Sequence, residues 1–290
     1  MKTSLSSLLF AALTFVAAPL FAQDDAQNAA EAQRQAFIQG FEQLLQNTDE
    51  GLSKSADTGE KFAIAPVTVA SNTYNLGIKV WFSLDDGTVF NPIKRKMAPS
   101  ERFHVHIQSA VPVFVSLFQN YPESRPESRQ VYPDKDHPET LKVVQANVPT
   151  KLPVAFIMDD DTRDEIMAMV VVRADDPKIQ TTLGTQPTVV TTTTTITSGT
   201  TAPAAAASTA TNTAAPASNV TVVAQATSGT LGTMKSINDE LADKRMGENA
   251  AKFNIASPTV AATTSTVPND VAFYMLGTGY AGQWQLTLKK

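Results

Sequence analysis

The sequence predicts a mainly β protein of the α+β class: an antiparallel β-sandwich-like body, preceded by an amphipathic helix and followed by a disordered linker and a small tail. Three observations predict this fold. Residues 61–177 hold about seven short runs of β-branched and aromatic residues separated by turn residues. Apolar residues recur at helical spacing before this region. After it, 56 consecutive residues, 179–234, carry no charge, and 19 of them are Thr and 11 are Ala.

Residues 1–22 are predicted to be a secretory signal peptide. Lys2 provides the positive charge, residues 8–20 form an apolar stretch too short to span a bilayer, and Ala22 is a small residue at the expected cleavage site. No cysteine follows the cleavage site, which excludes a bacterial lipoprotein. No later window of about 20 residues is continuously apolar, so we expect no transmembrane segment.

The charge and the cysteine content of the chain exclude several classes of function. Without residues 1–22 the chain has 268 residues and a formal charge of −6, and such a mildly acidic surface argues against general nucleic-acid binding. The absence of cysteine excludes disulfides, thiolate catalysis, Cys-ligated zinc and iron–sulfur clusters. A secreted protein without disulfides is ordinary for bacteria, so we expect a periplasmic or extracellular location.

The segment 23–60 is predicted to contain one helix, over 24–46, and a polar turn-like stretch, 47–60. The helix has no proline and one glycine, Gly40. An apolar stripe with spacing i, i+4, i+7 and i+8 is formed by Phe37, Phe41, Leu44 and Leu45.

The body, residues 61–177, is predicted to be a β-sandwich domain that can fold alone. Its clearest strand is 76–84, which includes Trp81 as an expected core residue, and 102–107 alternates between apolar and polar side chains. Further strands are predicted at 62–65, 67–69, 113–118, 141–144, 154–158 and 166–172. Residues 121–138 contain four prolines and are predicted to be a long exposed loop.

The linker and tail follow the body. Residues 178–234 lack the large apolar side chains that would offset the entropy of ordering them, so a disordered Thr/Ala-rich linker is predicted. The tail, 235–290, is predicted to hold a helix over 236–246 and a hairpin of strands 271–276 and 283–288, with Trp284 as a docking residue. About 55 residues make a marginal domain. We therefore expect the tail to add a strand to the body or to a partner.

Two groups of residues could bind a metal ion. His104 and His106 share one face of a strand, and with His137 they could form a zinc or copper site. The run 159–165 holds five carboxylates, including Asp161, and could bind calcium. The alternatives are solvated surface histidines and a solvated hairpin turn. No nucleophile, phosphate-loop or dinucleotide motif is present, so no catalytic, cofactor or metal residue is assigned.

Six short motifs follow one another between residues 76 and 175. They are Trp81-Phe-Ser-Leu-Asp-Asp-Gly87, Glu101-Arg-Phe-His-Val-His-Ile107, Val113-Phe-Val-Ser-Leu-Phe118, Val131-Tyr132-Pro133, Val148-Pro149 and Glu165-Ile-Met-Ala-Met-Val170. This part of the chain resembles a bacterial family of domains of unknown function, number 4384. Ser100 and Asp164 stand where that family usually has Gly. The resemblance implies a β-sandwich-like, non-catalytic module of exported or envelope-associated proteins, and it implies no catalytic residues.

We therefore expect an exported bacterial envelope protein that is not an enzyme and acts as a binding or assembly module, with an envelope or surface protein as partner. One alternative is a periplasmic hydrolase that uses a metal or a pair of carboxylates. A second alternative is a structural surface protein whose Thr-rich tract is a glycosylated stalk.

Overall fold

The computed structural model describes residues 18–58, 64–120, 129–183, 231–246, 252–260 and 267–290. The helices within these ranges are α1 (Ala18–Thr58), the 3-10 helix η1 (Pro138–Thr140), α2 (Pro177–Leu183), α3 (Leu231–Met246) and α4 (Pro268–Val271). The strands are β1 (Val67–Val69), β2 (Asn72–Tyr74), β3 (Leu76–Leu84), β4 (Val89–Phe90), β5 (Arg102–Ser109), β6 (Val113–Asn120), β7 (Arg129–Tyr132), β8 (Thr150–Ile157), β9 (Glu165–Arg173), β10 (Asn254–Ala256), β11 (Phe273–Gly277) and β12 (Ala281–Leu288). The predicted α+β class with mainly antiparallel sheets is confirmed. The predicted signal peptide lies largely outside the described residues.

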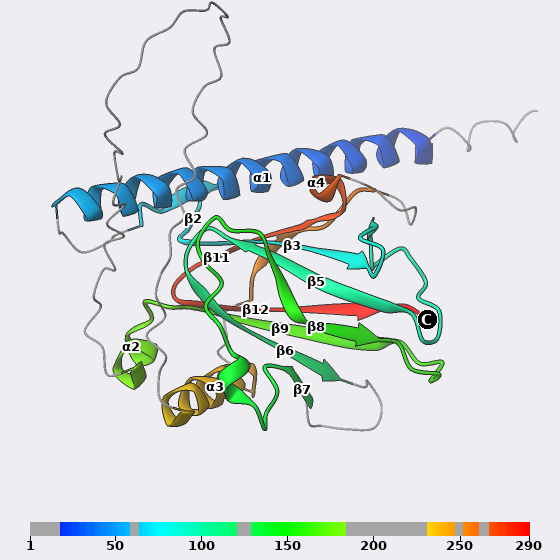
Figure 1. The fold of residues 1–290 in the computed structure, drawn as a ribbon. Helices are drawn as coiled ribbons and strands as arrows, with labels where there is room; N and C mark the ends of the chain where they lie inside the picture. Colours follow the sequence, from blue (N-terminus) through cyan, green and yellow to red (C-terminus); the bar gives the residue numbers. More distant parts are fainter. Residues whose placement is uncertain (1–17, 59–63, 121–128, 184–230, 247–251, 261–266) are drawn as a thin grey trace, which may run out of the picture.

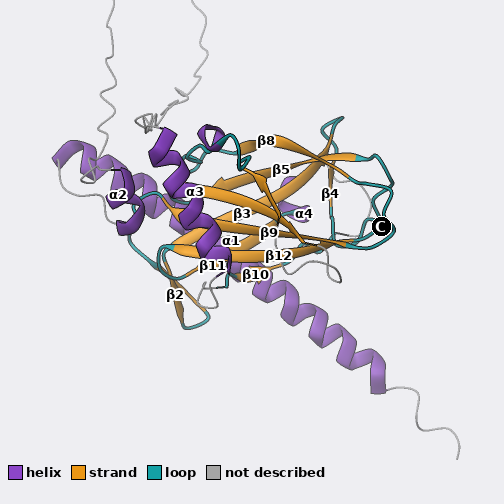
Figure 2. Cartoon of the chain, turned by 90° about the horizontal axis from the view of Figure 1, so that it is seen from below, coloured by secondary structure: helices purple, strands orange, loops and turns teal. Residues whose placement is uncertain are grey.

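The described strands form two packed sheets and a separate β1–β2 hairpin. Sheet I has the order β10-β11-β3-β5-β8, with β4 paired to β3, and sheet II has the order β12-β9-β6-β7. Helix α1 covers the outer face of sheet I, and α2 and α3 lie outside sheet II (Figures 1 and 2). The fold is thus a sandwich with helices on both outer faces, and buried apolar side chains fill the space between its sheets.

The C-terminal strands complete both sheets. Strand β11 pairs with β3 along its whole length, and β12 pairs with β9 from Ala281↔Val172 to Leu288↔Glu165. The predicted hairpin between these two strands is therefore wrong, because β11 and β12 belong to different sheets. A two-stranded hairpin would leave one face of each strand in water, whereas pairing with long buried strands satisfies the backbone and buries the side chains.

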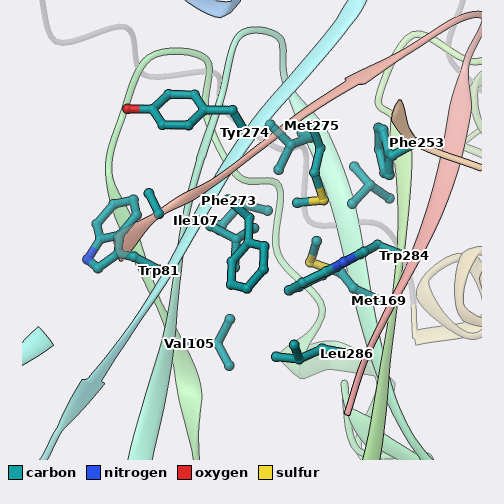
Figure 3. Close-up of a cluster of buried hydrophobic side chains, with 14 of the residues drawn as sticks. Trp81, Val105, Ile107, Met169, Phe253, Phe273, Tyr274, Met275, Trp284 and Leu286 are labelled. Atoms are coloured by element: carbon teal, nitrogen blue, oxygen red, sulfur yellow. The ribbon is translucent and has the colours of Figure 1, made fainter. Parts of the chain in front are cut away.

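Aromatic side chains from the C-terminal strands occupy the centre of the core (Figure 3). The Trp284 ring lies 4.7 Å from that of Phe273, and Phe273 meets Phe82 of β3 edge-on at 6.2 Å. Trp81 is also buried, but it lies on the outer face of sheet I, stacked on His106. Trp284 was predicted to be a docking residue, but it is a buried core residue.

Helix α1 is longer than predicted. The stretch 47–60 was predicted to be turn-like, but the helix continues to Thr58. This stretch contains no proline to stop the helix, and its Thr48 and Ser55 side chains are buried. The apolar stripe packs on sheet I, where a Cβ on Gly77 would come within 2.9 Å of Leu44. Glycine at this position therefore allows the helix to approach the sheet closely.

Parts of the predicted loops and linker are ordered elements. Strand β7 lies within the predicted loop 121–138, of which 121–128 are outside the described residues. The predicted linker 178–234 contains most of α2 and the start of α3, and only 184–230 lie outside the described residues. A second apolar cluster explains these helices, because Ile179, Ile237 and Leu241 are fully buried against sheet II.

One predicted strand is absent, and another begins earlier than predicted. Residues 141–144 form no strand, and Val144 makes only an isolated bridge to Val113. Leu141 instead packs in the cluster that includes α3 residues. Strand β8 begins at Thr150 rather than at residue 154. The C-terminal helix, predicted over 236–246, is present but already begins at Leu231.

Replacing Trp284 with alanine is expected to destabilise the protein by about 3–5 kcal/mol, the usual cost of deleting a buried aromatic ring. Urea unfolding of the full chain measures this change. Tyr280→Ala is the matched control, because Tyr280 lies just before the same strand and is 44% exposed. Equal losses for the two variants would contradict the central position of Trp284.

Candidate functional site

The three histidines do not come together. His104 Nε2 lies 2.8 Å from Asp85 Oδ1, and His106 Nε2 lies 2.8 Å from Ser83 Oγ, both on the outer face of sheet I. His137 precedes η1, and its Nδ1 lies 3.0 Å from Glu139 Oε1. Among the described residues, no group of three or more His, Asp or Glu side chains is placed to hold a metal ion. The candidate three-histidine site is therefore not assembled among the described residues.

Ser83 and His106 form a polar pair that the sequence analysis did not identify. The His106 ring stacks on Trp81 at 5.2 Å and 14°. Burial, with smaller contributions from the nearby Lys151 and His104, lowers the pKa of His106 to about 4, so the imidazole is neutral at pH 7. The sequence pattern that could have indicated this pair is the alternation in 76–84, which places Ser83 on the same face as Lys79 and Trp81.

This pair lacks the surroundings of a catalytic serine. The Ser83 residue is only 4% exposed, and its strand is paired on both sides, with Val89 and with His104. Backbone amides in a paired strand are used by the ladder and cannot form an oxyanion hole. The nearby carboxylate of Asp85 bonds His104 rather than His106. The arrangement is suited to joining β3 to β5 rather than to nucleophilic attack.

The lowered pKa of His106 predicts acid sensitivity. The unfolded chain, with a histidine pKa near 6.5, binds a proton that the folded state does not take up until about pH 4. Stability from this group is therefore lost as pH falls from about 6.5 to 4. Between pH 7 and pH 5 we expect a loss of about 1–2 kcal/mol in unfolding free energy. Urea unfolding of the wild type and His106→Gln measures it, and an equal pH dependence in both proteins would contradict this assignment.

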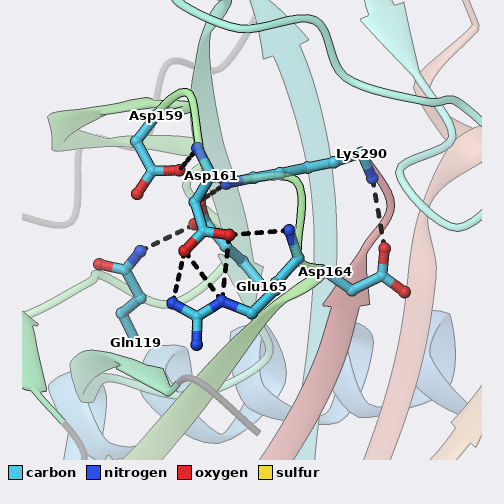
Figure 4. A network of polar contacts seen from close by, with 7 residues as sticks. Gln119, Asp159, Asp161, Asp164, Glu165 and Lys290 are labelled. Carbon is cyan, nitrogen blue, oxygen red and sulfur yellow. Dashed lines mark hydrogen bonds and ion pairs between the residues drawn. The ribbon is translucent and has the colours of Figure 1, made fainter. Parts of the chain in front are cut away.

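The acidic run 159–165 connects β8 to β9 and is bound by cations from the chain itself (Figure 4). Lys289 Nζ lies 2.6 Å from Asp164 Oδ2, and Lys290 Nζ lies 2.6 Å from Glu165 Oε1. Lys290 also pairs with Asp159, and Arg163 forks onto Asp161. Gln119 donates to Glu165 Oε2 at 2.8 Å.

These contacts lower the pKa values of carboxyl groups in the loop and indicate a structural role for them. The Arg163 side chain lowers the pKa of Asp161 to about 2, and Lys289 and Lys290 lower the pKa values of Asp164 and Asp159. The carboxylates that were candidates for calcium thus bond to side-chain cations. The contacts tie the end of β12 to the β8–β9 connection.

Lys290→Ala is expected to lower the unfolding free energy by about 1–2 kcal/mol, because it leaves the buried Glu165 carboxylate without its cation. Lys289→Ala is the matched control, since its pair with Asp164 is half-exposed and screened by water and should contribute less than the buried pair of Lys290. Thermal unfolding at pH 7 in low salt compares the two variants. A smaller loss for Lys290→Ala than for Lys289→Ala would overturn the assignment.

A hollow of about 310 Å³ lies between α1, the β1–β2 hairpin and β10. Its lining residues are Gln33, Phe37, Ala70, Asn72, Tyr74, Phe253, Asn254 and Ile255. Three of them are buried aromatic residues, and three are carboxamides with exposed side chains. None of these eight lining residues carries a carboxylate, imidazole, amine or guanidinium. The hollow can therefore offer an apolar wall and neutral hydrogen-bonding groups, but no acid or base suited to catalysis near neutral pH.

Glycines shape this hollow by allowing close packing. A Cβ on Gly282 would lie 2.4 Å from the Phe253 ring, and one on Gly277 would lie 2.9 Å from it. Both glycines lie on C-terminal strands, so β11 and β12 leave the space in which Phe253 sits. On the helix side, a Cβ on Gly40 would lie 2.6 Å from Val69, which shows how closely α1 approaches the hairpin. Both glycines lie between the predicted strands 271–276 and 283–288, in the connection of the predicted hairpin.

The hairpin turn beside the hollow is strained. Ala70 and Ser71 have φ values of 47° and 69°, which place both central residues in the left-handed region of a type I′ turn. Asn-Gly is the sequence that such a turn favours, and each non-glycine residue there costs roughly 1 kcal/mol or more. Ala70 itself lines the hollow. Strain of this kind is often retained at binding sites, where it positions neighbouring groups.

Comparisons with protein-family models, with curated proteins and with solved structures found no match to this chain. The helices in the described ranges include none with the length and apolar character needed to cross a membrane.

Proposed function

We propose that this chain is an exported, non-catalytic binding or assembly module of the bacterial envelope and that the hollow beside β10 is its contact site. The observation that carries the proposal is the lining of the hollow, in which buried aromatic rings meet neutral carboxamides without an acid or base. Two polar clusters elsewhere connect strands of the sandwich. Ser83 and His106 link β3 to β5, and the lysines near the C-terminus hold β12.

Two features of the sequence support the envelope setting. Residues 1–22 have the composition of an export signal, and the chain has no cysteine. The resemblance to family 4384 points in the same direction. Ser100, which stands where that family usually has Gly, has a φ of 62°, a conformation that glycine adopts without cost.

The alternative function is that of a hydrolase, and the Ser83–His106 pair bears on it directly. Ser83 and His106 are within hydrogen-bond distance, which is the observation in its favour. The buried position of Ser83 and the pairing of its strand on both sides of that residue argue against it. We therefore place the binding function first.

Filling the hollow should strongly reduce partner capture. Gln33 is exposed on α1 and lines the hollow, so Gln33→Trp introduces an indole there while leaving the residues of the hairpin and β10 unchanged. We expect this full-length variant to retain at least tenfold less of its partner than the wild type in chemical crosslinking to bacterial envelope fractions. Gln43→Trp is the matched control, since Gln43 is exposed on the same helix but does not line the hollow.

Two results would overturn the proposed function. The first is equal capture by Gln33→Trp and the wild type. The second is hydrolysis of an ester, peptide or glycoside substrate that Ser83→Ala or His106→Gln abolishes while the fold, measured by circular dichroism, is retained.

A further inference from the structure

We infer that the hollow takes an extended, uncharged polypeptide segment of a partner protein, which adds as a strand beside β10 and places one or two side chains in the hollow. This inference rests on the proposed binding function and specifies the class of partner.

The position of β10 provides the backbone for such pairing. Within the described residues β10 is the outermost strand of sheet I, paired with β11 through Asn254↔Leu276 to Ala256↔Tyr274. Asn254 and Ile255 of this strand also line the hollow. An outermost strand can hydrogen-bond an added strand, and side chains that alternate along that strand enter neighbouring pockets. Edge and hollow thus form one continuous surface.

The lining indicates an uncharged segment. A charged side chain entering the hollow would lose water without gaining a counter-ion, since none of the eight lining residues is charged. The carboxamides of Gln33, Asn72 and Asn254 both donate and accept hydrogen bonds, as peptide groups do. Asn254 already donates to the Tyr74 hydroxyl at 2.9 Å, which fixes its amide near the aromatic wall.

Size and ring exposure favour a peptide over a sugar. About 310 Å³ is at the lower end of ligand pockets, enough for a small part of a longer ligand. A sugar ring would need an exposed aromatic face for stacking, but Phe37, Tyr74 and Phe253 are each no more than 5% exposed. The aromatic residues therefore form a wall rather than a stacking platform.

The strained turn fixes the opposite side of the hollow. With Ala70 and Ser71 both at positive φ, the β1–β2 hairpin reverses in two residues, and the register Val69↔Asn72 sets the position of the Asn72 carboxamide. A tight turn loses little entropy when a ligand binds, so this side of the hollow is already ordered for an incoming strand.

Peptide binding to the full-length chain tests the inference. The probes are a fluorescent, end-capped octapeptide of alternating Thr and Val and a pool of octapeptides randomised over Ala, Ser, Thr, Val and Asn. One control peptide carries N-methyl groups on alternate amides, which block strand pairing, and another carries Glu at alternate positions. We expect anisotropy to show at least tenfold weaker binding of both controls and at least tenfold weaker binding of the probes to Gln33→Trp, with Gln43→Trp unchanged. Hydrogen exchange should slow at 254–256 when the probe is added.

The results separate this inference from the proposed function. Equal binding of the N-methylated peptide would overturn strand addition, and equal binding of the Glu peptide would overturn the uncharged class. Absence of binding by both probes at millimolar concentration would overturn the inference, although envelope capture that depends on Gln33 would leave the proposed function standing. Binding of an envelope glycan fragment that Gln33→Trp abolishes would assign the hollow to a sugar instead.

Discussion

The rest of the structure depends on the pairing of the last two strands with the middle of the chain. Strand β11 lies along β3 in one sheet and β12 lies along β9 in the other, so the two sheets receive strands from the same short stretch of sequence. Trp284 and Phe273 enter the space between the sheets from these strands. Without these two strands, β3 and β9 would each lose the neighbour on one side, and the core would lose two aromatic rings from its centre. The body and tail are therefore one folding unit, despite the long uncharged tract between them.

The same pairing creates the hollow. Phe253 sits against glycines of β11 and β12, and β10 follows it directly along the outside of β11. Arg34 of α1 donates to the backbone carbonyls of Ser257 at 2.8 Å and Ala272 at 3.1 Å, which ties the helix to the C-terminal segment. The wall of the hollow thus combines residues from the first helix, the first hairpin and the last quarter of the chain. Its form depends on contacts between residues nearly 240 positions apart.

Local pattern was sufficient to predict some elements and insufficient for others. The strand 76–84 follows from its run of β-branched and aromatic residues, and the stripe of α1 follows from helical spacing, because these local patterns favour each element whichever element lies opposite. The partners of β11 and β12 could not be predicted in this way, since a glycine-containing connection can serve a hairpin or a crossing between sheets. The hollow could not be predicted from a sequence motif, because its lining consists of neutral residues from distant segments. The Ser83–His106 pair depends on strand register, which the alternation of either strand alone does not determine.

The contact between α2 and α3 bears on how the length of this chain can vary in evolution. Lys178 Nζ lies 3.5 Å from Glu240 Oε1, and both helices pack on sheet II, so α2, which ends at Leu183, and α3, which begins at Leu231, are neighbouring elements. The entropy of closing a loop grows only slowly with its length, about 0.6 kcal/mol for each doubling. The composition of residues 178–234 predicts a linker, and a linker between two neighbouring helices can lengthen, shorten or accept an inserted domain at little cost to the sandwich. This junction is a place where related chains can diverge in size while keeping the same core.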